Sequence, residues 1–576
     1  MTTIHSSSNT GHDPVGSAIS DIKAYLGYAT LFSASINFLM LTPIIYMLQV
    51  YDRVISSGSM STLLMLTLLM TGLLAATGGF EWIRSRILIN ANVRLEKNLR
   101  DTVARASFKH TLITGNAGEA NQAMNDLVGL RQFLAGNGIF AFMDAPWTPI
   151  YIGVMFIFHP LFGYAAIVAG LIMILLAVLT QKFTAKRLVK ANALAARANG
   201  SFLSNLRNAE VIEGMGMASS IRSRNNQLFD LASTEQATAS GTAGILAAIT
   251  KSFRMIVQSL LLGLGAYLAL IQEISPGMMI AGSLLLGRAL APLDLMVSSW
   301  KSFITARSQF SRLQAGMKNL PPKVETLRLP EPLGNLSVQQ AIVIPPGAKI
   351  ASVKGVSFSL IAGEVLGVVG PSAAGKTSLI RGILGIWPLR AGTIRLDGAD
   401  ITQWNRDELG PYLGYLPQDI ELFDGTVSEN IGRFALQNAD KIIQASKIAG
   451  IHGMILGLPN GYDTVIGPNS GALSAGQRQR LGLARALYGS PKLIVLDEPN
   501  SNLDELGEQE LQNSIKQVKE AGSTVIIVTH RTSVLSLADK ILFIDGGIVQ
   551  RFGERNQVLQ ALKDQSSKVA QLKPKG

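Results

Sequence analysis

The stretch Gly370–Thr377 reads GPSAAGKT and fits the pattern G-x-x-x-x-G-K-[S/T]. An apolar run, VLGVVG (365–370), precedes it and a helix-favouring stretch (378–387) follows, as a phosphate-binding loop requires. A chance glycine turn would not combine strand, loop, lysine, threonine and helix. Backbone amides and the helix N-terminus favour phosphate, a lysine reaches the β- and γ-phosphates, and a threonine hydroxyl binds Mg²⁺. We expect nucleotide binding by Gly370, Pro371, Ser372, Ala373, Ala374, Gly375, Lys376, Thr377 and Ser378.

Two more apolar runs, KLIVLDE (492–498) and TVIIVTH (524–530), read as parallel strands buried on both faces. The first ends in two acids, and the carboxyl ends of parallel strands face the ligand. We expect Asp497 to bind nucleotide and Mg²⁺, and Glu498 to polarise the attacking water. Solvated acids at an exposed strand end are the alternative, which leaves the phosphate loop in the same domain unexplained.

Two single residues follow other predicted strands. His530 ends the run 524–530, and although a lone histidine is more often structural, this one is placed to contact a γ-phosphate. Gln418 follows the short strand 413–416 and could reach Mg²⁺ or water. The predicted catalytic residues are therefore Glu498, His530 and Gln418, and the predicted metal ligands are Thr377, Gln418 and Asp497.

The composition indicates a membrane protein with more than one domain. The chain has 576 residues, only 16% of them charged, with a net charge of +12 and a mean hydropathy of +0.29. Soluble proteins have about 25% charged residues. We attribute the positive charge to cytoplasmic loops, because no aromatic-basic pattern supports nucleic-acid binding. The absence of cysteine excludes disulfides, thiolate metal sites and cysteine nucleophiles.

Six apolar segments approach the length of about 20 residues that spans a bilayer as a helix. Buried core helices of a soluble protein are a poor alternative for six such runs. The two long intervals between spans are basic and helix-favouring, so we expect helices that continue into the cytoplasm and turn at 115–118 and 214–216. An even number of spans places both termini in the cytoplasm. The predicted spans are 26–50, 62–83, 139–158, 161–180, 253–271 and 278–300.

The domain prediction follows from these patterns. We expect a disordered tail (1–20), an α-helical membrane domain (21–315), a proline-rich linker (316–334), an α/β P-loop nucleotide-binding domain (335–563) and a flexible tail (564–576). Ionisable residues within apolar segments either line a wet pathway or mark span ends. We assign Asp144, Arg288 and Asp294 to the pathway, and Glu81, Arg84, Arg86, Lys251 and Arg254 to span ends.

The order of these motifs resembles the nucleotide-binding domain of the ATP-binding cassette (ABC) transporters, over about residues 335–563. Leu473–Gln477 reads LSAGQ and resembles the family signature LSGGQ, with Ala475 in place of a glycine. The segment 501–504 resembles the D-loop and His530 the switch histidine. Where the family has an aromatic residue for adenine, this chain has Ile344 or Pro345. The resemblance implies a homodimer with twelve spans, in which Leu473, Ser474, Ala475, Gly476 and Gln477 contact the partner's ATP and Ser501 and Asp504 form the D-loop.

Several phrases resemble bacterial type I secretion ABC proteins of the protease and lipase export class: 47–59, 143–151 and 379–401. This resemblance implies an inner-membrane exporter of unfolded polypeptides with a C-terminal signal, working with a periplasmic adaptor and an outer-membrane channel. About twenty-five residues precede the first span, so we expect no N-terminal cysteine peptidase domain. The alternatives are an ABC exporter of lipids or small amphiphiles, and a membrane-tethered ATPase without transport. The expected contacts include membrane lipids but no nucleic acid.

Overall fold

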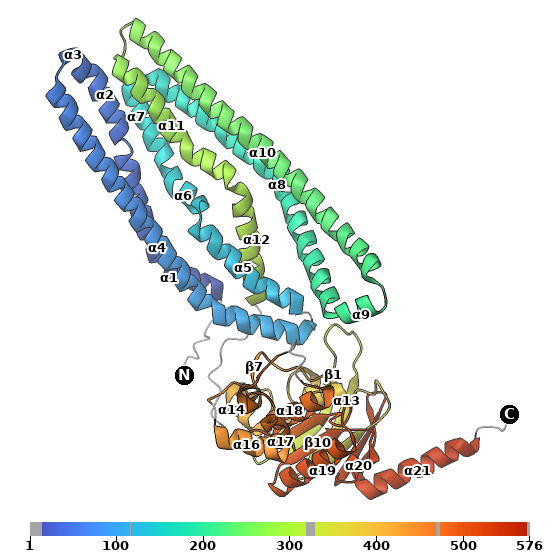
Figure 1. Ribbon diagram of the computed structural model, residues 1–576. Coiled ribbons are helices and arrows are strands. Elements are labelled where there is room, and N and C mark those ends of the chain that lie inside the picture. Colours follow the sequence, from blue (N-terminus) through green and yellow to red (C-terminus); the bar gives the residue numbers. More distant parts are fainter. Residues whose placement is uncertain (1–13, 116, 318–328, 437, 468–472, 573–576) are drawn as a thin grey trace, which may run out of the picture. The chain divides into compact units, whose positions relative to one another are not determined.

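The computed structural model describes residues 14–115, 117–317, 329–436, 438–467 and 473–572. The chain divides near Pro322 into two compact units. The first is helical (Figure 1), and six of its described helical segments are long and apolar enough to cross a membrane. Most of the predicted linker, and residues 1–13 and 573–576 of the predicted tails, lie outside the described residues.

The elements of the first unit follow in chain order. They are α1 (Pro14–Leu39), α2 (Thr42–Gln49), η1 (Val50–Val54), α3 (Ile55–Ser57), α4 (Met60–Thr114), α5 (Ala117–Ala135), α6 (Asn137–Asp144), η2 (Ala145–Trp147), α7 (Thr148–Phe158), α8 (Pro160–Arg207), α9 (Ala209–Gly214), α10 (Ala218–Leu270), α11 (Pro276–Ser298) and α12 (Trp300–Met317).

Two predicted spans are not single helices. The segment 26–50 breaks between α1 and α2, and 139–158 breaks at the 3-10 turn η2. Proline explains both breaks: Pro43 lies in the first turn of α2, and Pro146 and Pro149 flank Trp147. Proline donates no backbone hydrogen bond and fits best in the first turn of a helix, whereas in the interior it kinks or breaks the helix. Each of these two predicted spans is therefore interrupted by proline, although both still count among the candidate spans.

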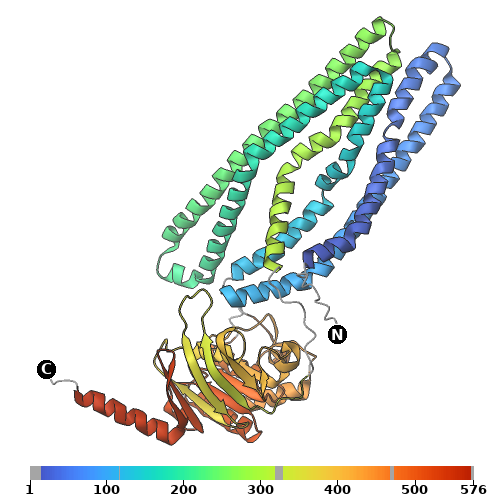
Figure 2. The ribbon, with the colours of Figure 1, turned by 180° about the vertical axis from the view of Figure 1, so that it is seen from behind.

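Three helices continue far beyond a membrane thickness, as the long basic intervals predict. Helix α4 has 55 residues, α8 has 48 and α10 has 53, which at 1.5 Å per residue makes each about 70–80 Å long. Helices α8 and α10 run side by side and are joined through α9 (Figures 1 and 2). The turns contain Gly115 and Gly216 in the left-handed conformation, with φ of 71° and 65°, at the predicted places.

The predicted disorder of residues 1–20 was wrong from residue 14 onward. Helix α1 begins at Pro14, and the side chains of Val15 and Ile22 are buried. They belong to one apolar cluster with Leu95 and Leu99 of α4. The polar residues in this stretch concealed the apolar stripe of an amphipathic helix, whose burial stabilises it.

The second unit contains the predicted parallel sheet. Its strands lie in the order β12-β11-β3-β10-β9-β6, with only β12 antiparallel to its neighbour, and a separate antiparallel sheet has the order β2-β1-β4-β5. The strands are β1 (Leu336–Val343), β2 (Val353–Leu360), β3 (Val365–Val369), β4 (Leu389–Leu396), β5 (Ala399–Asp400), β6 (Leu413–Leu416), β7 (Gly425–Thr426), β8 (Val465–Ile466), β9 (Leu493–Asp497), β10 (Thr524–Val528), β11 (Lys540–Asp545) and β12 (Ile548–Glu554).

The helical elements of this unit lie between those strands in the chain. They are α13 (Lys376–Ile383), α14 (Arg406–Leu409), η3 (Gly410–Tyr412), α15 (Val427–Ile431), α16 (Ala439–Ile448), α17 (His452–Leu456), η4 (Gly461–Asp463), α18 (Ala475–Leu487), α19 (Glu505–Glu520), α20 (Thr532–Leu535) and α21 (Arg555–Leu572). Helix α21 continues to Leu572, so residues 564–572 of the predicted tail are helical.

The central parallel strands β3, β9 and β10 are almost entirely apolar because each separates two cores. Alternate residues of a strand point to opposite faces. Leu493 and Val495 of β9 belong to the cluster shared with the antiparallel sheet. Ile494 and Leu496 belong to the cluster that α16, α18 and α19 complete. Five consecutive buried residues in β3, β9 and β10 follow from this arrangement.

Candidate functional site

The carboxyl ends of the parallel strands bring three predicted catalytic residues together. Asp497 at the end of β9 aligns with Val528 of β10, and Leu496 aligns with Leu416 of β6. Residues just beyond these ends are therefore neighbours. Gln418 Nε2 donates to Glu498 Oε2 at 3.0 Å, and His530 Nε2 lies 3.8 Å from Glu498 Oε1. Gln418 and His530 therefore flank the Glu498 carboxylate, although they lie 80 and 32 residues away from it in the sequence.

The phosphate loop is shaped by two close approaches to neighbouring backbone. A Cβ at Gly375 would lie 2.3 Å from the Ser352 carbonyl oxygen, and φ there is +98°. A Cβ at Gly370 would lie 2.0 Å from the carbonyl oxygen of Ile544. Both distances are shorter than any van der Waals contact, so only glycine fits at either position. The two glycines of the motif thus keep the loop against β2 and β11, as well as leaving room for phosphate.

Lys376 lies inside its own loop. Its Nζ donates to the carbonyl oxygens of Gly370 at 2.8 Å and Pro371 at 2.9 Å. Burial lowers the pKa of Lys376, while Glu498 and Asp497 act in the opposite direction. A phosphate group would offer this desolvated cation a charged acceptor in place of two neutral carbonyls, which strengthens such a hydrogen bond.

Ala373 carries backbone strain within the loop. Its φ is +63°, a left-handed conformation that costs an alanine about 1–2 kcal/mol. The sequence pattern leaves this position unrestricted, so nothing in the motif indicated the strain. Outside the loop, Ile344 and Pro345 follow β1 directly and are half-buried. Their contact with adenine stays a prediction.

Asp497 is a buried carboxylate without a partner. Its exposed fraction is 1%, and neither of its carboxylate oxygens has a hydrogen-bond partner among the described residues. Burial raises the pKa of Asp497 and the neighbouring charge of Glu498 adds to this, while the Thr377 hydroxyl and the charges of Arg381 and Lys376 partly oppose it. Leaving such a group unsatisfied costs free energy, so this site is suited to a cation that the carboxylate can ligate.

Glu498 has an unusual backbone conformation that aims its side chain. Its φ is +49°, and its N–H donates to the Val528 carbonyl at 2.9 Å. Its own carbonyl accepts from Gln479 Nε2 at 3.2 Å. Sequence reasoning missed Gln479, which is 2% exposed. The signal was present, because Gln479 lies four residues before Leu483 and so on the apolar face of its helix, where a polar residue needs a partner.

The LSAGQ segment starts helix α18, whose first residue is Ala475. Ser474 is the N-cap: its Oγ accepts from Gln477 N at 3.2 Å, and Gln477 Oε1 accepts from Ser474 N at 2.8 Å. Among the described residues, this reciprocal capping box occupies the amides of Ser474 and Gln477 and leaves those of Ala475 and Gly476 for an anion. A Cβ at Gly476 would lie 2.8 Å from the carbonyl oxygen of Asn502. Ala475 is exposed, so a methyl group fits there and not at Gly476. Leu473 is buried.

The two D-loop residues have contacts within their own chain. Ser501 Oγ lies 3.4 Å from Gln479 Nε2, and Asp504 caps α19 by accepting from Gly507 N at 2.9 Å. The first contact joins the segment 501–504 to α18, and the second joins it to the start of α19.

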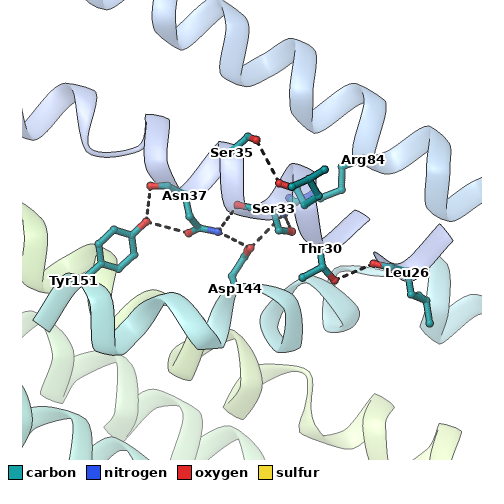
Figure 3. A network of polar contacts seen from close by, with 9 residues as sticks. Leu26, Thr30, Ser33, Ser35, Asn37, Arg84, Asp144 and Tyr151 are labelled. Carbon is teal, nitrogen blue, oxygen red and sulfur yellow. Dashed lines mark hydrogen bonds and ion pairs between the residues drawn. The ribbon is translucent and has the colours of Figure 1, made fainter. Parts of the chain in front are cut away.

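A polar network lies within the spans. Arg84 Nη1 donates to Ser33 Oγ at 2.8 Å and lies 3.4 Å from Asp144 Oδ1 (Figure 3). Asn37 Nδ2 donates to the same carboxylate oxygen at 2.8 Å, and the Tyr151 hydroxyl donates to the Asn37 carbonyl at 2.9 Å. Arg84 is 7% exposed, so its assignment to a span end in contact with water was wrong. The network joins α1, α4, α6 and α7 next to the breaks in spans one and three.

The other ionisable residues in and near the spans do not separate into pathway and span-end groups as predicted. Arg254 Nε lies 3.5 Å from Asp294 Oδ2, so a residue assigned to a span end pairs with one assigned to the pathway. Arg288 is exposed. The other residues assigned to span ends are exposed as well: Glu81, Arg86 and Lys251.

Comparison with known proteins identifies the family. Residues 353–501 match the model described as ABC transporter, and residues 26–292 match the model of the ABC transporter transmembrane region. The type I secretion system ATP-binding protein PrsD of Rhizobium meliloti is 44% identical over 559 residues, which cover 96% of this chain and 95% of PrsD. The cyclolysin secretion/processing ATP-binding protein CyaB of Bordetella pertussis is 28% identical, over 93% of this chain and 76% of CyaB.

A solved structure shows the same fold. A bacterial Atm1-family ABC exporter with ATP bound superposes with a TM-score of 0.78 at 21% identity, covering 96% of this chain and 99% of that one. The predicted fold class, a helical membrane domain joined to a P-loop domain, is confirmed. The chain belongs to the ABC transporter family as an ATP-hydrolysing membrane protein, and within it to the type I secretion ATP-binding proteins.

Proposed function

We propose that this chain energises the export of unfolded polypeptides with a C-terminal secretion signal. One observation carries the proposal: a site that brings Gln418, Glu498 and His530 together is joined in one chain to six candidate spans. The names of PrsD and CyaB, which assign both to secretion, support a polypeptide cargo. A lipid or amphiphile cargo would use the same ATPase, so the cargo needs its own experiment.

The contacts suggest a role for each group at the nucleotide. Lys376 and the backbone N–H groups of 372–378 bind the phosphates, and Glu498 accepts a hydrogen bond from the attacking water. Gln418 and His530 flank Glu498 and can orient that water or the γ-phosphate. Asp497 and Thr377 would hold Mg²⁺, because the buried Asp497 oxygens are otherwise unsatisfied. Mg²⁺ would neutralise phosphate charge there.

The variant Glu498→Gln tests the catalytic assignment. It removes the acceptor for the water proton but keeps the side-chain shape, so it should bind ATP normally, abolish steady hydrolysis and trap a dimer. ATP affinity, phosphate release and size-exclusion chromatography measure these effects. Hydrolysis near the wild-type rate would show that another group activates the water.

A secretion experiment tests the cargo. The gene and a neighbouring adaptor gene are deleted separately, and the proteins outside the cells are compared with those of the parent strain. Loss of the same extracellular protein in both strains supports a polypeptide cargo. Unchanged secreted proteins together with a lipid or drug phenotype would contradict it.

The assembly belongs to the same proposal. We infer a homodimer in the bacterial inner membrane, with both termini cytoplasmic, a periplasmic adaptor and an outer-membrane channel. The residues of LSAGQ would contact the partner's ATP, since the free amides at the start of α18 suit an anion. Co-purification of two differently tagged copies tests the dimer.

A further inference from the structure

Gln479 makes hydrogen bonds to two backbone groups of the turn that follows strand β9 and begins at Glu498. Its Nε2 donates to the Glu498 carbonyl at 3.2 Å, and its Oε1 accepts from Asn502 N at 3.0 Å. A carbonyl only accepts and a backbone N–H only donates, so these partners determine the orientation of the side-chain amide. The Gln479 side chain therefore closes the turn from 498 to 502.

The backbone conformation at Glu498 is unfavourable and needs support from neighbouring groups. Glu498 has φ of +49°, which an L-residue other than glycine rarely adopts. Its N–H is bonded to Val528 in the sheet, and its carbonyl has two donors, Gln479 Nε2 and Ser501 N, the latter also at 3.2 Å. Loss of Gln479 would leave Ser501 N as the remaining donor to this carbonyl, so the peptide would be held more weakly and the side chain of Glu498 would gain freedom to move.

We propose that Gln479 is a positioning residue for ATP hydrolysis, which holds the catalytic Glu498 of its own subunit in place and ties it to helix α18. The close approach of Gly476 to the Asn502 carbonyl, one helical turn earlier on the same face, makes α18 and the segment 498–502 a single packed element. The inference rests on the proposed function, in which Glu498 activates the water.

The first test uses Gln479→Met in the full-length protein. Methionine has a similar volume to glutamine but cannot make the same hydrogen bonds. The single-turnover hydrolysis rate should therefore fall about tenfold, which corresponds to the free energy of one hydrogen bond. The Kd for ATP should stay unchanged. Gln479→Glu still accepts from Asn502 but cannot donate as an ionised group, and should show the same loss if it folds. The same change at Gln517→Met, which is exposed on α19, is the matched control and should have no effect.

Mixed dimers separate this role from a contact with the partner's nucleotide. Differently tagged copies are co-expressed and purified through both tags, and the first turnover is measured, because Glu498→Gln can trap the dimer afterwards. When one subunit carries both Gln479→Met and Glu498→Gln, the other subunit keeps its own Gln479 and Glu498. The hydrolysis rate of this mixed dimer should match the rate of a mixed dimer in which one subunit carries Glu498→Gln alone. When the two changes lie in different subunits, the rate should fall about tenfold.

The outcomes are distinct. Loss confined to the dimer with the changes in different subunits supports the inference. Loss in the first dimer, equal loss in both, or no loss in Gln479→Met homodimers would overturn it. Failure of the proposed function gives another result, since Glu498→Gln homodimers would then hydrolyse ATP or no mixed dimer would form.

Discussion

Replacing Asp497 by Asn should stabilise the nucleotide-free protein while removing its response to Mg²⁺. Asp497 is 1% exposed and neither oxygen has a partner among the described residues. An amide of the same shape carries no charge, so its burial costs less. Leaving a buried polar group unpaired costs about 1–3 kcal/mol, and more for a charged group. We therefore expect the change to stabilise the second unit by about 2 kcal/mol.

The pH dependence has a definite sign. Burial raises the pKa of Asp497, so the folded protein binds this proton more tightly than the unfolded chain does. Ionisation therefore opposes folding above the ordinary aspartate pKa of about 3.9. The destabilisation is complete once the pH exceeds the raised pKa. The difference in Tm between variant and wild type should be largest near pH 7 and shrink as the pH falls towards the raised pKa.

Thermal unfolding of the full-length protein in detergent measures the effect. For a unit of this size 1 kcal/mol corresponds to about 2–4 °C, so the nucleotide-free variant should unfold about 4–8 °C higher. Ligand at a hundred times its Kd stabilises a protein by about 2.7 kcal/mol. Wild type should therefore gain about 5–10 °C with saturating Mg²⁺–ATP. The part of this gain that depends on Mg²⁺ is the difference in Tm between protein with Mg²⁺–ATP and protein with ATP and EDTA. Asp497→Asn should lose that difference.

Glu498→Gln is the matched control for this prediction, because it makes the same chemical change at the adjacent residue. The Glu498 carboxylate already has a donor in Gln418, so its conversion to an amide should not raise the nucleotide-free Tm. The explanation would be refuted if Asp497→Asn left that Tm unchanged, or if it kept the full increment from Mg²⁺.

Three further predictions concern other positions. Asp144→Ala leaves Arg84 buried without the carboxylate of Asp144 and should lower the free energy of unfolding by about 3 kcal/mol, measured by thermal unfolding. The double variant Arg84→Met with Asp144→Leu should recover most of this loss. An equal loss in the double variant would contradict the ion-pair interpretation. Ala475→Gly should change ATPase activity less than about twofold, because the methyl group is exposed; a large increase would identify it as a brake. Ala373→Val should lower both Tm and ATP affinity, since a β-branched residue tolerates positive φ poorly, while Ala373→Gly should not; equal effects would argue against strain.

Local patterns made much of the fold and the site predictable. The phosphate loop is contiguous in sequence, and apolar runs of strand or span length are local features. The grouping of Gln418, Glu498 and His530 was predictable because one topological rule places all carboxyl ends of parallel strands at the same edge. The helix turns at Gly115 and Gly216 followed from glycine in otherwise helix-favouring intervals.

Contacts between distant residues were beyond this reasoning. Arg84 and Asp144 are 60 residues apart, and each alone reads as a span-end or a pathway charge; their pairing depends on how α4 packs beside α6. Gln479 reads as one of several polar residues in a helix until α18 packs against the turn after β9. The sequence by itself determined which groups can react with ATP, because these lie in local motifs at strand ends. Only the tertiary structure decided which of these groups are positioned by hydrogen bonds, which are desolvated and which lack a partner, because those properties depend on contacts with residues that are distant in the sequence.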